Sequence, residues 1–236
     1  MIELFLENSR DLSLLSIGIR ILLSLIVGGI MGMERGRKNR PAGFRTYILV
    51  CLGAALVMMT NQYVYQTYNV SDPVRLGAQV ISGIGFLGAG TIMMTGKNQI
   101  KGLTTAAGLW TAACCGLAIG IGFYEGAIFG SLAILFAISG LQNFDTWMRK
   151  RSKYLDVYIE YKESEIPFHD FLQYAKEKQF DITNIQINYD TPLYRDKNAK
   201  YSTSYILTAH TLTRRTHAES IDILSQAKGV QYIEEI

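Results

Sequence analysis

The chain has 236 residues, a formal net charge of +3 and 49% hydrophobic residues. This charge gives no basic face of the kind that nucleic-acid binding needs, so we expect no nucleic-acid partner. The three cysteines lie in apolar runs without metal-ligand spacing, and we interpret them as small buried residues. We expect neither a metal site nor a cofactor. Composition changes near residue 153: 21 of the 22 glycines precede it, and a mildly acidic segment follows.

Five apolar stretches precede this change, and each approaches the ~20 helical residues that cross a bilayer core. The third contains ISGIGFLGAG. Small residues let helix backbones approach closely in lipid, so this run predicts a packed central helix. The N-terminus has no basic segment or small-residue cleavage site, so we expect no cleaved signal peptide. The stretches are Leu12–Met33, Phe44–Val64, Leu76–Met94, Leu103–Gly122 and Gly126–Leu141.

Basic residues between the stretches predict the orientation. The segments 35–45, 97–101 and 149–153 together hold eleven Lys and Arg residues, all on one side of the predicted membrane. The positive-inside rule puts that side in the cytoplasm. With five spans, the N-terminus is then outside. Residues 1–150 are therefore predicted to form a multi-pass transmembrane domain in a lipid bilayer, and residues 154–236 a cytoplasmic domain.

The C-terminal segment has the pattern of an α+β domain. YLDVYIEY, ITNIQINY, YSTSYILTAHTLT and VQYIEEI alternate as strands, while FHDFLQYAKEKQF and SIDILSQAKG have helical spacing, the latter ended by Gly229. The order β-α-β-β-α-β is that of the ferredoxin-like fold. We interpret residues 191–200 as a mobile hairpin loop. One sheet face lacks helices and must meet water, a partner or the membrane domain.

Ionisable residues near membrane depth are rare and often functional. On the first span, a stripe of Arg20, Ser24, Gly28 and Met31 leads to Glu34, and a buried stripe with a charge at each end needs partners. We expect Glu34 to pair with Arg45 across the short loop, with Arg35 and Lys101 as competing cations. The alternative is that these residues are boundary anchors that extend to water. In the same way, Asp72 is a candidate N-cap with Pro73 at the first helical position.

Three ordered motifs closely resemble the MgtC/SapB family of bacterial inner-membrane proteins. They are ERG…PAGFRTYILVCLGAAL, DPVRLGAQVISGIGFLGAGTIM and IKGLTTAAGLWTAACCGLAIGIG. The resemblance as a whole covers about residues 25–150. This chain has Gly36 where the family often has an acid, and Tyr47 where it often has His. We add Lys101, an ionisable residue at the start of the fourth span, to the candidate functional residues. The motif positions are Glu34, Arg35, Gly43, Arg45, Asp72, Pro73, Arg75, Gln79, Gly83, Gly85, Gly88, Gly90, Gly102, Thr104, Thr105 and Trp110.

The resemblance implies an ACT-like C-terminal domain and homo-oligomers. It also implies adaptation to low magnesium and to life inside host cells, through regulation of membrane proteins such as the F-type ATP synthase. A channel or carrier is the alternative. Against a dedicated Mg²⁺ site, which needs oxygen ligands, the predicted spans hold no acid at mid-depth. We expect no enzymatic activity, because no nucleophile–base pair is visible.

Overall fold

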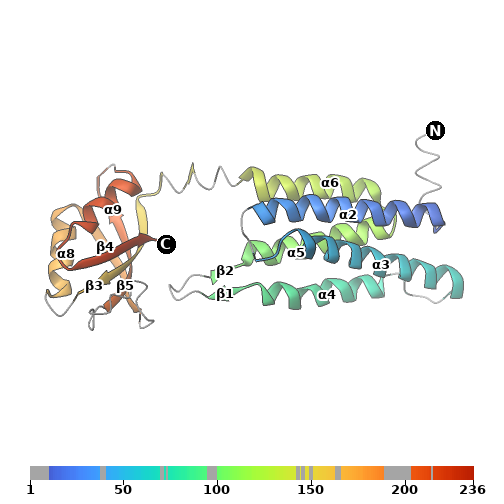
Figure 1. Cartoon of the computed structure of the whole chain (residues 1–236), viewed down its shortest axis with the longest axis horizontal. Coiled ribbons are helices and arrows are strands. Elements are labelled where there is room, and N and C mark those ends of the chain that lie inside the picture. The colour runs from blue at the N-terminus through green and yellow to red at the C-terminus, as the bar shows by residue number, and fades with distance from the viewer. Residues whose placement is uncertain are drawn as a thin grey trace. The chain divides into compact units, whose positions relative to one another are not determined.

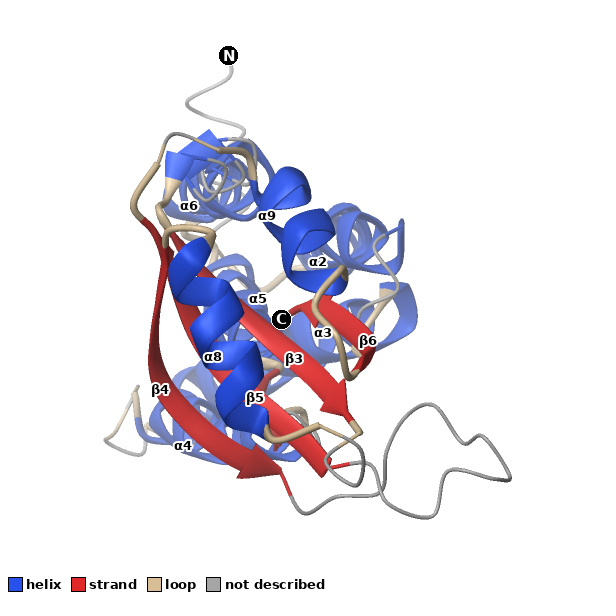
Figure 2. Ribbon diagram, turned by 90° about the vertical axis from the view of Figure 1, so that its left-hand side faces the viewer, coloured by secondary structure: helices blue, strands red, loops and turns tan. Residues whose placement is uncertain are grey.

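The computed structural model of the chain contains two compact units that divide near residue 143. The first unit is built from helices, and the second is a sheet with two helices (Figures 1 and 2). The described residues are 11–37, 41–69, 72, 74–94, 100–141, 144, 147–148, 151–162, 166–188, 203–213 and 215–236.

Each of the five predicted apolar stretches contains a helix in the described part of the chain. Three helices, α2, α3 and α5, are long and apolar enough to cross a membrane. The helix α4 is shorter, and α6 continues as a π-helix, η1, to Gly140. The bounds are α2 Leu14–Arg37, α3 Phe44–Tyr68, α4 Arg75–Gly90, α5 Leu103–Gly120, α6 Tyr124–Leu135 and η1 Phe136–Gly140.

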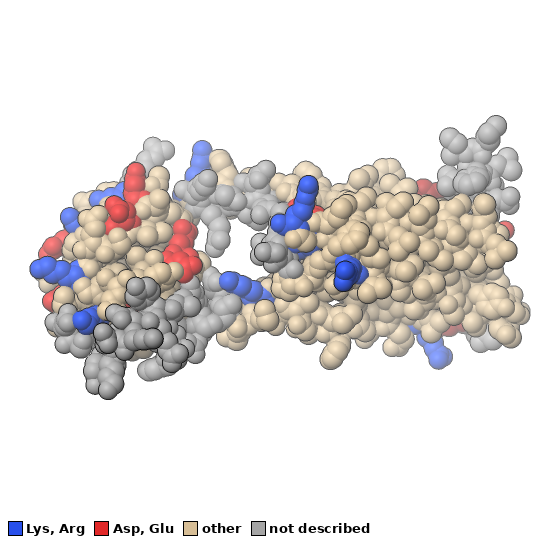
Figure 3. Space-filling model, viewed as in Figure 1, with Lys and Arg blue, Asp and Glu red and all other residues tan. Residues whose placement is uncertain are grey.

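The outer surface of the helical unit is apolar. Large hydrophobic side chains are exposed on its helices, including Leu22 (58%), Leu49 (67%), Phe86 (84%) and Phe129 (73%). Few charged side chains interrupt the face seen in Figure 3. A large exposed apolar surface marks an interaction with lipid or protein, so this surface agrees with a membrane location for the three long helices.

The prediction of a packed central helix is wrong for α4. Only Gly77, Ile84 and Gly88 are buried among its residues. The physical reason is that α4 packs on one side only, mainly against α5 and less against α3. The central position belongs to α5, which packs against α2, α3, α4 and α6. A Cβ added to the remaining glycines of the run would meet nothing within 4 Å; these are Gly83, Gly85 and Gly90.

A two-stranded hairpin joins α4 to α5, so α4 ends at Gly90 and before the predicted end at Met94. Gly102 lies between the hairpin and α5 with φ +101°, and an added Cβ would collide with the carbonyl group of Thr91. Only glycine fits this conformation and this approach. The strands of the hairpin are β1 Met93–Met94 and β2 Ile100–Lys101.

The C-terminal unit has the predicted βαββαβ order. Its four strands form an antiparallel sheet in the order β4-β5-β3-β6. Residues 191–200, predicted as a hairpin loop, lie outside the described residues. The bounds are β3 Tyr154–Tyr161, α8 Phe168–Glu177, β4 Phe180–Asn188, β5 Thr203–Thr211, α9 His217–Ser225 and β6 Val230–Glu235.

Strand alternation builds the core of this unit. Val157 and Ile159 of β3 pack with Leu207 of β5 against Phe171 of α8 and Leu224 of α9. Because successive side chains of a strand point to opposite faces, both helices cover one face of the sheet. The core is therefore complete within the C-terminal unit.

The helix α9 begins earlier than predicted from SIDILSQAKG. A capping box between Thr216 and Glu219 fixes its start at His217, since each side chain accepts a hydrogen bond from the other residue's backbone N–H. The helix ends at Ser225, before Gly229. Gly229 instead serves the turn into β6, with φ +91°.

Candidate functional site

Glycines bring the backbones of α2 and α3 into contact. A Cβ added to Gly28 would lie 2.9 Å from the Cα of Ile48, and one added to Gly32 would lie 2.7 Å from the Cα of Phe44. Both separations are too short for any side chain. Glycines four residues apart on one helix face permit such an approach in membranes. The contact holds the C-terminal half of α2 against the start of α3.

The same principle joins α5 to α3. A Cβ added to Gly120 would lie 2.8 Å from the Cβ of Met58, and one added to Gly116 would collide with the carbonyl group of Cys51. Together these contacts define a glycine seam, formed by Gly28 and Gly32 of α2, Gly116 and Gly120 of α5 and the facing residues of α3. The seam fixes the positions of two buried arginines of α2.

Arg20 is fully buried at one end of the seam. Its Nη1 donates hydrogen bonds to Gln62 Oε1 at 2.7 Å and to the carbonyl oxygen of Gly120 at 2.7 Å, and its Nε donates to Tyr124 Oη at 3.3 Å. One guanidinium thus connects α2, α3, α5 and α6. Gly120 is the last residue of α5, where the helix dipole is negative, so this location favours a cation.

Arg35 is the buried cation at the other end of α2, with 5% of its surface exposed. Its Nη2 donates a hydrogen bond to Thr105 Oγ1 at 2.8 Å. Thr105 is also buried, in the first turn of α5. Arg35 therefore joins the C-terminal end of α2 to the N-terminal end of α5.

Tyr47 of α3 completes this end of the seam. Its side chain is fully buried, and its hydroxyl group lies within electrostatic range of the Arg35 guanidinium. The hydroxyl also lies over Gly108 of α5, where any Cβ would collide with it. Neither Tyr47 Oη nor Arg35 Nε has a hydrogen bond of normal geometry within the described residues.

The predicted motif positions separate into buried, half-buried and exposed groups. Three are buried at helix contacts: Arg35, Thr105 and Gly88, whose added Cβ would lie 3.4 Å from the Cβ of Ala106. Glu34, Gly43 and Gly102 are half-buried, and Pro73 lies outside the described residues. The exposed positions are Arg45, Asp72, Arg75, Gln79, Gly83, Gly85, Gly90, Lys101, Thr104 and Trp110.

Asp72 lies two residues before the N-cap of α4, close to the capping position predicted for it. Its Oδ1 accepts a hydrogen bond from the backbone N–H of Val74 at 3.1 Å, and α4 begins at Arg75. The N-cap position belongs to Val74 rather than to Asp72. The carboxylate therefore fixes the turn that precedes the helix.

Glu34 and Arg45 line two different pockets of the helical unit. Glu34 lines a pocket of about 350 Å³ between α2 and the segment formed by α6 and η1, together with Arg37 and Ser139. Arg45 lines a groove of about 500 Å³ between α3 and α4. Their expected ion pair stays a prediction.

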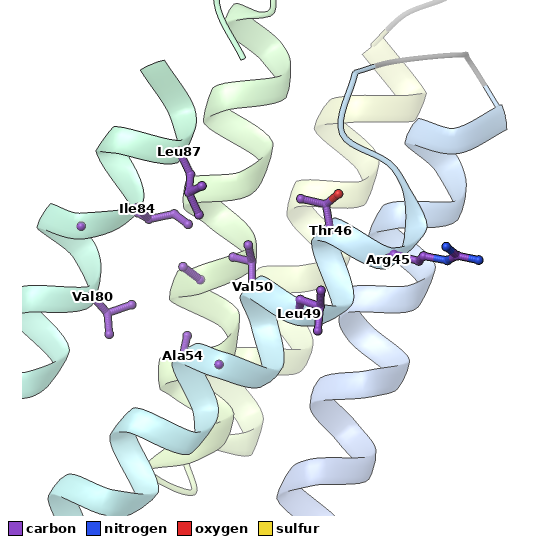
Figure 4. Close-up of a pocket in the computed structure, with 11 residues that line it drawn as sticks. Arg45, Thr46, Leu49, Val50, Ala54, Val80, Ile84 and Leu87 are labelled. Atoms are coloured by element: carbon purple, nitrogen blue, oxygen red, sulfur yellow. The ribbon is translucent and has the colours of Figure 1, made fainter. Parts of the chain in front are cut away.

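The groove between α3 and α4 is apolar along its length. Val50 and Ala54 of α3 and Val80, Ile84 and Leu87 of α4 form its walls (Figure 4). At the α3 N-terminus, the guanidinium of Arg45 extends away from α4. Gly83 also lines the groove, so this position of the glycine-rich run faces an open surface, whereas Gly88 contacts α5.

Some residues of the site were missed by the sequence reasoning. Gln62 and Tyr124, the partners of Arg20, gave no signal, because nothing in the sequence relates them to each other or to α2. The glycine seam did give one, since Gly28 and Gly32, like Gly116 and Gly120, are four residues apart. This four-residue spacing is a signal of close helix approach in the same way as the glycine-rich run in α4.

The described residues contain no group of three or more His, Cys, Asp or Glu side chains that could hold a metal ion. The arrangement is instead one of buried cations that hydrogen-bond neutral oxygens. Chemically, it can fix helices together and attract negative charge.

Comparisons with a family model and with known proteins all indicate the same family. The MgtC family matches residues 21–147. The "Putative magnesium transporter YhiD" of Escherichia coli K12 is 35% identical over 177 residues, which cover 73% of this chain and 81% of that protein. Protein SapB of Bacillus subtilis is 32% identical, over 75% of this chain and 88% of SapB. Protein MgtC of Salmonella typhimurium LT2 is 40% identical, over 50% of this chain and 49% of MgtC. No solved structure matches the chain.

Proposed function

The chain belongs to the MgtC family of Mg²⁺-related membrane proteins, and we propose that it is a non-enzymatic regulator of other membrane proteins. It acts at the bacterial inner membrane, in adaptation to low Mg²⁺ and to life inside host cells. This role follows the resemblance of the three sequence motifs to the family.

One structural observation carries the choice of a regulator: the glycine seam closes the helical unit, while the groove along α4 stays open at its side. Close contact at Gly28, Gly32 and Gly116 brings α2 and α5 directly against α3 and leaves no space between the helices there. The groove, in contrast, offers apolar walls. A closed bundle with a lateral apolar surface suits contact with another membrane protein.

Subunits of the F-type ATP synthase are the proposed partners, and crosslinking tests them. A photoreactive residue at Gly83 in the groove should capture an ATP-synthase subunit in cells grown at low Mg²⁺. The matched control is the same residue at Gly18 of α2, which is exposed with nothing within 4 Å of an added Cβ. Capture of the same proteins from both positions, or from neither, would contradict the proposal.

Transport of an ion or small solute is the second candidate, favoured by the name of the Escherichia coli relative, "Putative magnesium transporter YhiD". The distribution of acids opposes a dedicated Mg²⁺ path, because α3, α4 and α5 contain no Asp or Glu. Purified protein in liposomes loaded with a Mg²⁺-sensitive dye decides between the two. Flux above that of empty liposomes, abolished by filling the groove with Gly83→Trp, would establish transport.

The proposed membrane arrangement has five spans, with the N-terminus outside and an ACT-like domain in the cytoplasm. The helices α4 and α6–η1 would be short spans of roughly 25 Å at 1.5 Å per residue, which a locally thinned bilayer accommodates. The loop charges support this orientation. In a chain without its native cysteines, a membrane-impermeant thiol reagent applied outside should label a cysteine at Asn69 and not one at Asn98. The reverse pattern would overturn it.

A further inference from the structure

Positive charge collects around Arg35, and the helices α3, α4 and α5 bring no acid to it. Arg35 is 95% buried and lies beside the first turn of α5. The N-cap residue of α5, Gly102, provides no side-chain cap, and the first turn contains no acidic residue. The N-terminus of α3, capped by Gly43, has the same two properties. Each N-terminus carries about half a positive charge on free N–H groups, so a buried cation is unfavourable there.

Acidic residues are scarce among the helices that surround Arg35. The helices α3, α4 and α5 contain no Asp or Glu, and Glu34 is the one acid between residues 12 and 71 of the sequence. Glu34, the neighbour of Arg35 in the sequence, lines a pocket with Arg37 and Ser139. A buried cation left without a counter-charge is strongly destabilising, so this location calls for an anion from outside the chain.

Two buried donors mark where such an anion binds. Tyr47 Oη and Arg35 Nε are both buried and without a normal hydrogen bond, and the two groups lie close enough to interact electrostatically. Buried polar groups in proteins nearly always have hydrogen-bond partners, so two neighbouring groups that both lack one require an explanation. A hydroxyl beside a guanidinium at a helix N-terminus provides the donors that phosphate groups accept from.

We propose that Arg35, Tyr47 and the N-terminal turn of α5 bind a phosphate group. Arg35 Nε and Tyr47 Oη donate to its oxygens, and the free backbone N–H groups of α5 complete the site. The phosphate belongs either to inorganic phosphate or to the headgroup of an anionic phospholipid. Both have the same chemistry, and the two arms of the experiment separate them. The proposal does not depend on the regulatory role.

The test uses the purified full-length protein. In detergent, thermal unfolding is followed against inorganic phosphate, with sodium chloride at matched ionic strength as the reference. In nanodiscs, unfolding is compared between phosphatidylcholine alone and phosphatidylcholine with phosphatidylglycerol. A ligand that binds only the folded state raises the unfolding temperature in proportion to its occupancy. An increase with phosphate in detergent identifies the free ion, and one with phosphatidylglycerol alone identifies the lipid.

Two variants and one control assign the effect to this site. Tyr47→Phe removes only the hydroxyl group and should weaken the apparent phosphate affinity about tenfold, the effect of one hydrogen bond to a charged group. Arg35→Lys keeps the charge but loses Nε and should weaken it at least as much. The control, Arg45→Gln, removes an exposed cation near the α3 N-terminus and should retain the wild-type response.

The variants' unfolding temperatures in chloride alone show that each is folded before its response is compared. A response to neither phosphate nor phosphatidylglycerol would overturn the proposal and assign water to the two donors. An equal response in wild type and Tyr47→Phe would also overturn it. So would loss of the response in Arg45→Gln with retention in Arg35→Lys, because binding would then lie at the surface.

Discussion

Arg20 and Arg35, the two buried cations of α2, contact opposite ends of α5. Arg20 donates a hydrogen bond to the carbonyl group of Gly120, the last residue of α5, and Arg35 donates one to Thr105 in its first turn. The two arginines are about 22 Å apart along the helix at 1.5 Å per residue. The dipole of α5 favours the first contact and opposes the second. The contact of Arg20 with the C-terminal end of α5 is therefore stabilising by itself, whereas the contact of Arg35 with the N-terminal end of α5 requires a further, negatively charged partner.

Replacement of Arg20 should destabilise the helical unit. Arg20→Met removes the hydrogen bonds to Gln62, Tyr124 and the Gly120 carbonyl group. The loss is roughly 1–3 kcal/mol for each buried group that stays unsatisfied. We expect the unfolding temperature in detergent to fall by several degrees. Arg75→Met, at an exposed arginine at the start of α4, is the control and should cause no measurable change. Equal unfolding temperatures for the two variants would contradict a structural role.

The glycine seam should tolerate no methyl group. In Gly32→Ala, the added Cβ would lie 2.7 Å from the backbone of Phe44, which a helix cannot move without separating from its neighbour. We expect a loss of about 1–3 kcal/mol in unfolding free energy, the usual effect of overpacking. Gly36→Ala, on the same helix, meets nothing within 4 Å and should gain up to ~1 kcal/mol from helix propensity. Opposite signs in denaturant unfolding would support the seam, and equal losses would not.

The sequence predicted which segments are apolar helices and which are strands, because both depend on local periodicity. The βαββαβ order and the buried stripe of Arg20, Ser24 and Gly28 were also predicted correctly. The partners of the stripe were not. Gln62 reaches Arg20 only because the glycine seam sets the separation of α2 and α3, and such long-range contacts leave no local signal.

The centre of the helical unit was predicted wrongly for a related reason. Glycine content alone cannot tell a helix that packs on two sides from one that packs on one side. The run in α4 and the glycines of α5 look alike in sequence, but only Gly88 of the run contacts a neighbouring helix. The number of helices around each segment decides between these cases, and that number is a property of the fold.

The glycine-rich run should therefore respond unevenly to larger side chains. Gly88 is buried against Ala106 with space for a methyl group, whereas Gly83 faces the open groove. Gly88→Ala should be tolerated, Gly88→Leu should separate α4 from α5, and Gly83→Leu should leave the fold intact. Thermal unfolding and detergent size-exclusion profiles check the three variants. A Gly83→Leu variant as unstable as Gly88→Leu would place a helix contact on both faces of α4.

The C-terminal unit should fold alone and associate. Its core uses only its own residues, such as Val157, Leu207 and Leu224, so residues 151–236 should give a cooperative unfolding transition without the helical unit. Association is expected at β4, an edge strand in the order β4-β5-β3-β6, which exposes 48% of Ile187. Unpaired edges of this kind readily pair with another chain unless a charge blocks them.

Light scattering on a size-exclusion column measures this association. We expect a dimer at high micromolar concentration, and a monomer for Ile187→Lys, because a lysine at the edge opposes pairing. The control is Leu212→Lys, at a residue that is 61% exposed just beyond β5. A monomeric wild type would contradict association of this unit. A dimer that persists in Ile187→Lys would move the interface away from β4, to the face of the sheet that carries no helix.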